Sequence, residues 1–176
     1  MYQMKRITFL IVSIIVLMGL QSFTAVIYVP SQIDVVKIDK KKMVERHNFY
    51  RKKVGVPPVV WSDELAVYAD KWAKRLAQRC ELKHRKKDDY GENIYWHSAK
   101  SAEYAAVDSW ASEEEFFNHK KRTFKSNASG RYGHYTQIIW RKTERIGAAV
   151  RNCPGGGQIW VCNYDPPGNY IGEKVY

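Results

Sequence analysis

The sequence predicts an α+β domain, because helical periodicity and strand periodicity occur in separate parts of the chain. Helical spacing is present over residues 43–54 and again from Ser62 to Cys80. Residues 145–151 and 158–164 are short and rich in apolar side chains, and a Pro-Gly-Gly-Gly turn lies between them. This pattern is typical of two paired antiparallel strands. We therefore expect helices packed against a small antiparallel sheet.

The first predicted helix contains Met43, His47 and Tyr50 on one face. Gly55 ends it, since glycine is the residue most common just after a helix. His47 lies at a core position of this helix, so we expect it to order the helix rather than to bind a ligand.

The second predicted helix begins after Ser62, a good N-terminal cap. Its apolar stripe continues for four turns and consists of Leu65, Ala69, Trp72, Leu76 and Cys80.

A third helix is predicted from about Ser101 to Phe117, with Tyr104, Val107 and Trp110 facing inward. Before it, residues 93–96 form a short apolar strand pattern. After it, residues 119–131 are polar and basic, as in an exposed loop.

The N-terminal residues have the composition of an export signal. Lys5 and Arg6 precede an uncharged apolar run from Ile7 to Leu20, which is the order found in signal peptides. We predict a signal peptide at 1–25, a linker at 26–39 and one domain at 40–176. The alternative is an uncleaved anchor extending to about residue 29, since about 20 apolar residues can span a bilayer. Both place the domain outside the cytoplasm.

The chain is basic, with a formal net charge of +11 over 176 residues. Such a surface would attract an anionic membrane, a cell-wall polymer or an acidic protein partner. Nucleic acid is excluded as the expected partner, because no recognised binding module is present and an exported protein does not meet it. The charge is concentrated in four runs, at 40–42, 51–53, 84–87 and 119–122.

Three cysteines, Cys80, Cys153 and Cys162, allow at most one internal disulfide. Export to an oxidising compartment favours a bridge. From the residues alone, Cys153 and Cys162 could close the hairpin between the two C-terminal strands.

Two long motifs near the C-terminus resemble the signatures of the CAP superfamily, which groups cysteine-rich secretory proteins, antigen 5 and pathogenesis-related protein 1. Residues 133–140 read GHYTQIIW, and residues 159–170 read IWVCNYDPPGNY. The resemblance implies a three-layer α-β-α sandwich over 40–176. The chain is most similar to the pathogenesis-related type, since no cysteine-rich tail follows the second motif.

The resemblance also implies a cleft that contains two histidines and two glutamates. The matching positions are His84, Glu92, Glu113 and His134. Imidazole and carboxylate groups are suitable ligands for Zn²⁺ or another divalent metal, with His84 and His134 as the main ligands. The same four groups could instead form a hydrogen-bonded structural network without metal.

For the cysteines, the resemblance implies a bridge between Cys80 and Cys153. Cys162 would then be a buried free thiol, because its usual partner position holds Ala148.

These residues favour a secreted binding module over an enzyme, with a lipid or sterol, an envelope polymer or a protein as its partner. One alternative is a metal-dependent hydrolase using the same cleft, and another is a cationic membrane-active defence protein.

We also expect the basic segment 119–131 to lie beside the cleft. Asn127 begins an N-glycosylation sequon, which matters only if the source glycosylates exported proteins.

Overall fold

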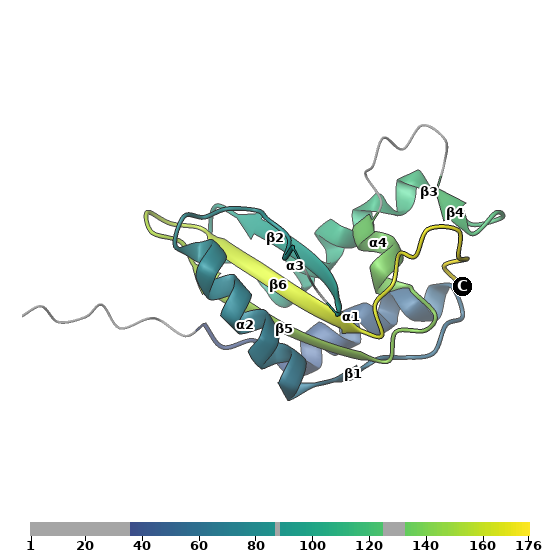
Figure 1. Ribbon diagram of the computed structural model, residues 1–176, viewed down its shortest axis with the longest axis horizontal. Helices are drawn as coiled ribbons and strands as arrows, with labels where there is room; N and C mark the ends of the chain where they lie inside the picture. The colour runs from purple at the N-terminus through teal and green to yellow at the C-terminus, as the bar shows by residue number, and fades with distance from the viewer. Residues whose placement is uncertain (1–35, 87–88, 125–132) are drawn as a thin grey trace, which may run out of the picture. The chain divides into compact units, whose positions relative to one another are not determined.

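The computed structural model describes residues 36–86, 89–124 and 133–176 (Figure 1). The helical elements are α1 (Lys40–Lys53), α2 (Asp63–Ala77), α3 (Glu103–Ala111), the 3-10 helix η1 (Ser112–Phe116) and α4 (Gly133–Ile138). The strands are β1 (Val60–Trp61), β2 (Gly91–His97), β3 (Phe117–Asn118), β4 (Thr123–Phe124), β5 (Arg145–Asn152) and β6 (Gln158–Asp165). The predicted leader at 1–25 and most of the predicted linker lie outside the described residues.

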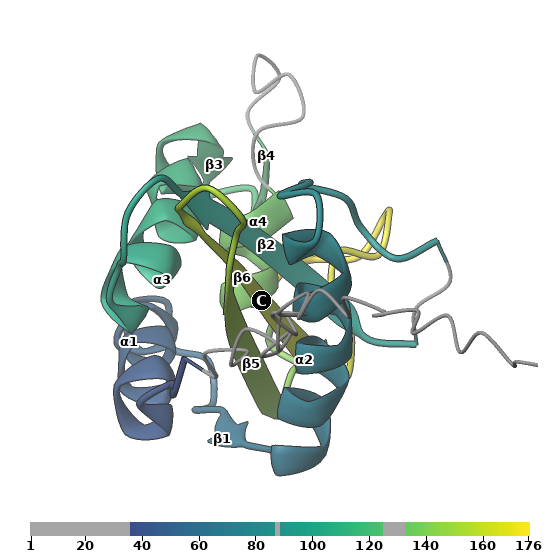
Figure 2. The same ribbon diagram turned by 90° about the vertical axis from the view of Figure 1, so that its left-hand side faces the viewer.

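The elements form three layers around a four-stranded sheet of order β1-β5-β6-β2. Helix α2 packs on one face of the sheet, and α1, α3 and α4 lie on the other (Figure 2). The predicted α+β sandwich is therefore confirmed. The sheet is mixed, because β1 runs parallel to β5 while the other pairs are antiparallel. The prediction of an antiparallel sheet was wrong for β1 alone, because this strand is too short to produce a strand pattern in the sequence.

Each interface between layers has its own apolar core. Beneath α2, small side chains such as Ala69 and Ala73 meet Ile159 and Val161 of β6. The opposite core contains large aromatic residues, among them Trp110. Helices cover both faces of the sheet, so β6 is buried from Gln158 to Tyr164 and has no exposed alternate side chains.

Gly147 of β5 permits the close packing of α2 on the sheet. A Cβ atom at this position would come within 2.2 Å of the backbone nitrogen of Ala66. Any larger residue would therefore push α2 away from β5, so Gly147 sets the thickness of this layer.

Two helices differ from their predicted lengths. The chain leaves α2 after Ala77, and Cys80 has a positive φ of 54° in the turn that follows. The third helix ends at Ala111 and continues as the tighter η1, where Ser112 Oγ donates to the carbonyl of Ser109.

The prediction that Tyr104 faces inward was wrong. It lies in the first turn of α3, is 40% exposed and packs beside the guanidinium of Arg46.

One residue of the four basic runs is not at the surface. Arg51, the first residue of the run at 51–53, is completely buried and donates to carbonyl groups at the end of α4 and just after it, whereas Lys52 and Lys53 are exposed. The residues just before α1 also belong to the domain, since Val36 and Ile38 pack against the core and Asp39 caps the helix.

Across the described part of the chain, none of the helices has the length and apolar content that crossing a lipid bilayer requires.

Candidate functional site

His84 forms a hydrogen-bonded pair with Glu92. His84 lies in the segment 81–86 that follows α2, and Glu92 is the second residue of β2. The Nδ1 atom of His84 is 2.8 Å from Oε1 of Glu92. The backbone N–H of Arg85 donates to the same oxygen at 3.3 Å. The side chain of Glu92 is 5% exposed and that of His84 is 59% exposed, so a buried carboxylate holds an imidazole at the surface.

His134 and Glu113 form a second pair of the same kind. Oε1 of Glu113 is 2.7 Å from Nδ1 of His134. Its other oxygen, Oε2, accepts from the backbone N–H groups of His134 and Tyr135 at 2.8 and 3.1 Å. One carboxylate from η1 thus fixes both the ring of His134 and the first turn of α4.

Asn93 connects the two His–Glu pairs. It follows Glu92 directly in β2, and its Nδ2 donates to the carbonyl of His134 at 3.1 Å and to the hydroxyl of Tyr164 at 3.0 Å. Asn93 is 1% exposed, so both bonds are shielded from water.

In both pairs the carboxylate is bonded to the Nδ1 atom of the imidazole. When a neutral histidine donates its Nδ1 proton to a carboxylate, its Nε2 keeps a lone pair that can accept a proton or bind a ligand. The four residues predicted from the sequence are therefore arranged as two oriented histidines, supported by a buried carboxylate at Glu92 and a partly buried one at Glu113.

Comparison with known proteins identifies the family of this chain. The family model described as "CAP: Cysteine-rich secretory protein family" matches residues 44–164. The chain belongs to the CAP family. It is 43% identical over 135 residues to pathogenesis-related protein 1C of Nicotiana tabacum, an alignment that covers 76% of this chain and 78% of the relative.

Solved structures agree on the fold. Na-ASP-1 has a TM-score of 0.66 and 24% identity, with 78% of this chain and 41% of that chain covered. A structure titled "NaASP2 with Zn2+" has a TM-score of 0.64 and 23% identity, and covers 84% of this chain and 88% of its own. The first of these chains is more than twice as long as the aligned CAP domain.

The CAP domain of this chain does not assemble all four residues as ligands of one ion. In residues 36–86, 89–124 and 133–176 there is no group of three or more His, Cys, Asp or Glu side chains placed to hold a metal. Both carboxylates are directed at the imidazoles that they support. The Nε2 atom of each histidine is a donor of the type that Zn²⁺ prefers, whereas the described residues do not form a closed four-ligand centre.

His47 occupies the interior of the CAP domain behind the site. Its Nδ1 lies 2.8 Å from the carbonyl of Met43, and its Nε2 lies 3.0 Å from the hydroxyl of Tyr164. Tyr164 in turn bonds Asn93, so a buried chain of hydrogen bonds runs from α1 to the His134 backbone. The sequence placed both His47 and Tyr164, which the second signature motif contains, in the core, but it did not predict the hydrogen bonds of Tyr164.

Stability should depend on pH through His47. Burial lowers its pKa from 6.5 to about 4, opposed by the hydrogen bond to Met43 and reinforced by the positive charge of Arg51. Below pH 6.5 the unfolded chain binds a proton at this site that the folded chain does not, so stability is full above 6.5 and falls as the pH drops towards 4. The loss should total about 3 kcal/mol, since one pKa unit corresponds to about 1.4 kcal/mol.

Urea unfolding at pH 7 and pH 5 measures this effect. Carboxylates also titrate over part of this range, so the wild type is compared with His47→Gln at each pH. The variant should be less stable at pH 7 but lose less stability on acidification. Equal losses in the two proteins would assign the pH dependence to other groups.

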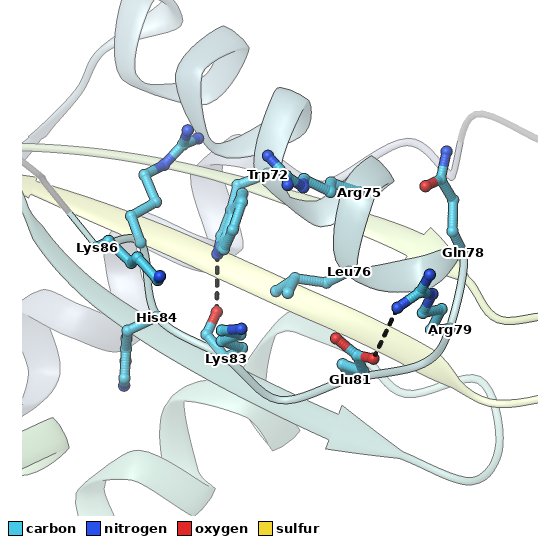
Figure 3. A pocket seen from close by; sticks show the side chains of 10 residues that line it. Trp72, Arg75, Leu76, Gln78, Arg79, Glu81, Lys83, His84 and Lys86 are labelled. Atoms are coloured by element: carbon cyan, nitrogen blue, oxygen red, sulfur yellow. Dashed lines mark hydrogen bonds and ion pairs between the residues drawn. The ribbon is translucent and has the colours of Figure 1, made fainter.

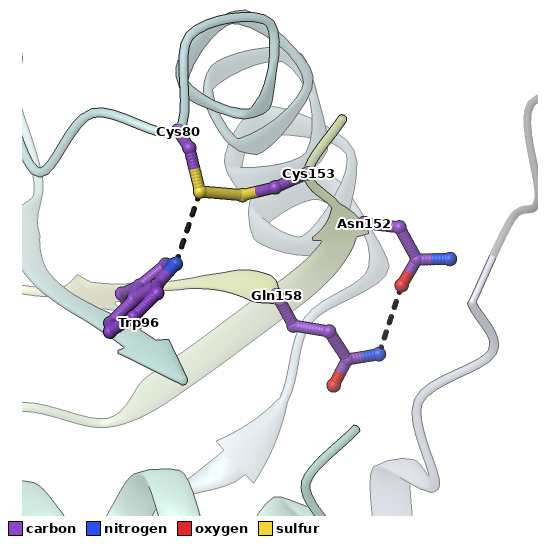
Figure 4. Close-up of a disulfide and its surroundings, with 5 residues drawn as sticks. All are labelled: Cys80, Trp96, Asn152, Cys153 and Gln158. Carbon is purple, nitrogen blue, oxygen red and sulfur yellow. Dashed lines mark hydrogen bonds between the residues drawn. A yellow bond between two sulfur atoms is a disulfide. The ribbon is translucent and has the colours of Figure 1, made fainter. Parts of the chain in front are cut away.

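The disulfide joins Cys80 to Cys153, as the resemblance implied (Figure 4). It connects the turn after α2 to the end of β5. The indole N–H of Trp96 points at the sulfur of Cys80, at 3.0 Å. Cys162 is a free thiol within the described residues and is fully buried, which raises its pKa to about 12. A thiol in this state is unreactive.

The basic segment 119–131 is described only up to residue 124, and Asn127 lies outside the described residues. Lys121 and Arg122 line a cavity of about 510 Å³ whose wall includes Gly133, the residue before His134. Arg122 also donates to the backbone oxygen of Tyr176 at 3.1 Å. This part of the segment therefore helps to hold the C-terminal residues in place.

Proposed function

We propose that this protein is an exported CAP-domain binding module that uses its two oriented histidines to hold a ligand. The observation that carries the proposal is that each imidazole is held through Nδ1 by a carboxylate, at 2.8 and 2.7 Å, and that the Glu92 and Glu113 side chains are only 5% and 17% exposed. Removing a carboxylate from water is costly unless it is hydrogen-bonded, and here the hydrogen bonds of both glutamates also fix the directions of the imidazole rings.

Export is supported by the leader pattern in residues 1–25 and by the disulfide. Bridges such as Cys80–Cys153 persist mainly in oxidising compartments outside the cytoplasm. The partner in this proposal is an anionic envelope polymer, a lipid or a protein. It is attracted by the basic surface and meets the oriented histidines.

A divalent metal would be held by His84 and His134, with Glu92 and Glu113 as the groups that orient them. The solved relative titled with Zn²⁺ supports zinc as the first ion to test. A bound ion would supply a Lewis acid at the site. Glu92 and Glu113 would set the direction of each imidazole through their hydrogen bonds to Nδ1.

Thermal unfolding with zinc tests the proposed role of the histidines. At a few times the dissociation constant, Zn²⁺ should stabilise the protein by about 1 kcal/mol and raise Tm by about 2 to 4 °C. His84→Ala combined with His134→Ala should abolish this shift, because both proposed ligands are lost.

The matched control is His97→Ala, which removes a histidine whose Nδ1 contacts only the local backbone at Ala99 among the bonds described. This variant should keep the zinc shift. If zinc leaves the Tm of the wild type unchanged, the pairs are structural and the proposed ligand role of the histidines is wrong.

A further inference from the structure

A second recess, separate from the Glu113–His134 pair, lies between the last turns of α2 and the segment 81–86 (Figure 3). Its volume is about 540 Å³, within the range of small-ligand sites. We call it the α2 groove. Among the residues that the structure describes, one carboxylate, Glu81, lines it, together with five cationic side chains: Arg75, Arg79, Lys83, Arg85 and Lys86.

Trp72 organises the groove. Its indole N–H donates to the carbonyl of Lys83 at 2.9 Å and so ties the segment to α2. The guanidinium groups of Arg75 and Arg85 lie 5.4 and 5.0 Å from the Trp72 ring. Arg85 also donates to the carbonyl of Tyr68 at 2.7 Å. Arginines held in this way lose little freedom when they bind an anion, and their planar donors match a carboxylate.

The positive charge of the groove is only partly compensated. Glu81 pairs with Arg79 at 3.9 Å, and Oε2 of Glu92 lies 3.8 Å from Nε of Arg85. In the described part of the chain, Arg75, Lys83 and Lys86 form no ion pair with a carboxylate. Like charges gathered in a recess repel one another, and an anion that enters relieves this repulsion.

We propose that the α2 groove binds a linear acidic polysaccharide, whose successive carboxylates meet the successive cationic side chains. The inference rests on the proposed binding function and names the partner class, but it uses residues other than the Glu113–His134 pair. His84 borders the groove, so a bound chain would reach the His84–Glu92 pair.

A polysaccharide fits the groove better than a membrane surface does. The cations surround a hollow, whereas a bilayer presents its charges on a broad face. The aliphatic side chain of the groove, Leu76, is 3% exposed and cannot insert into lipid. Leu82 on the neighbouring segment is 63% exposed, so anionic vesicles serve as the competing partner in the test.

Calorimetric titration with a short oligogalacturonate at low ionic strength tests the proposal. The groove variant is Arg75→Gln, Lys83→Gln and Lys86→Gln. These residues are exposed, so the fold should be retained, and thermal unfolding verifies this. The matched control is Lys37→Gln, Lys41→Gln and Lys52→Gln, which removes the same charge from exposed positions in or just before α1, across the sheet from α2.

The groove variant should bind about tenfold more weakly than the wild type, while the control should change much less. A methyl-esterified oligogalacturonate, which lacks the charges, should not bind the wild type. The proposal is overturned if the acidic oligomer does not bind, or if both variants lose the same affinity. It is also overturned if vesicles of anionic phospholipid bind through the groove residues and the oligomer does not.

His134→Ala separates this inference from the proposed role of the histidines. The variant should lose the zinc shift and keep its affinity for the oligogalacturonate, because His134 does not line the α2 groove. If the wild type binds the oligogalacturonate but its Tm does not change with zinc, the groove inference holds and the proposed ligand role of the histidines is wrong. If zinc raises the Tm but the oligogalacturonate does not bind, the ligand role of the histidines holds and the groove inference is wrong.

Discussion

Replacing Arg51 with methionine should lower the free energy of unfolding by about 4 kcal/mol, because several buried carbonyl groups lose their donor at once. The Arg51 guanidinium donates to the carbonyls of Pro57, Ile138, Trp140 and Thr143, at 2.7 to 2.9 Å. Burial lowers the pKa of Arg51 to about 10, so the group stays charged at neutral pH. Urea unfolding at pH 7 measures the loss.

Two further variants show whether the hydrogen bonds are the cause. Arg51→Lys keeps the charge but cannot extend donors to the same four carbonyls, so it should be nearly as destabilising as methionine. Lys52→Met changes the exposed neighbour in α1 and should alter stability by less than about 0.5 kcal/mol. If Arg51→Lys proved as stable as the wild type, charge alone would explain the role of Arg51.

Arg51 also shows where sequence reasoning about charge fails. Within the run Arg51-Lys52-Lys53, only the first residue faces the core, since α1 buries the side that carries Met43, His47 and Tyr50. A count of basic residues cannot separate a solvated lysine from an arginine that satisfies buried carbonyls. Three of the four carbonyls, those of Ile138, Trp140 and Thr143, lie at the end of α4 or just after it, about 90 residues later in the chain, so no local pattern indicates them.

The elements predicted well are those with a signal of their own. Ser62 caps α2 as expected, accepting from the backbone N–H of Leu65, and β5 and β6 pair across the glycine-rich turn. Strand β1 and helix α4 were missed as elements. Strand β1 is two residues long, and the residues of α4 were known only as part of a signature motif.

The site depended on resemblance more than on periodicity. Glu113 and His134 are 21 residues apart and lie on different elements, so nothing in their spacing predicts the 2.7 Å contact between them. The motif positions supplied the four candidates, and the structure shows that these residues form two hydrogen-bonded pairs. The division into two pairs follows from the fold, because Glu92 and Glu113 reach the site from β2 and from η1.

Removing the disulfide should destabilise the protein by a similar amount to Arg51→Met. Cys80 and Cys153 are separated by 73 residues. Releasing a loop of this length restores about 4 kcal/mol of conformational entropy to the unfolded chain in the chain-entropy model. The double variant Cys80→Ser and Cys153→Ser should lose this amount in urea unfolding, and reduction of the wild type should have the same effect.

The remaining cysteine provides the control. Cys162→Ala leaves the bridge intact and removes a buried thiol from the core, so it should cost only about 1 kcal/mol. Peptide mapping of this variant without reduction should still recover Cys80 and Cys153 in one crosslinked fragment.

The bridge also anchors the end of α2, and the α2 groove begins beside it at Gln78 and Arg79. Reduction should therefore weaken oligogalacturonate binding as well as stability. Unchanged binding after reduction would mean that Trp72 and its bond to Lys83 hold the groove without help from the disulfide.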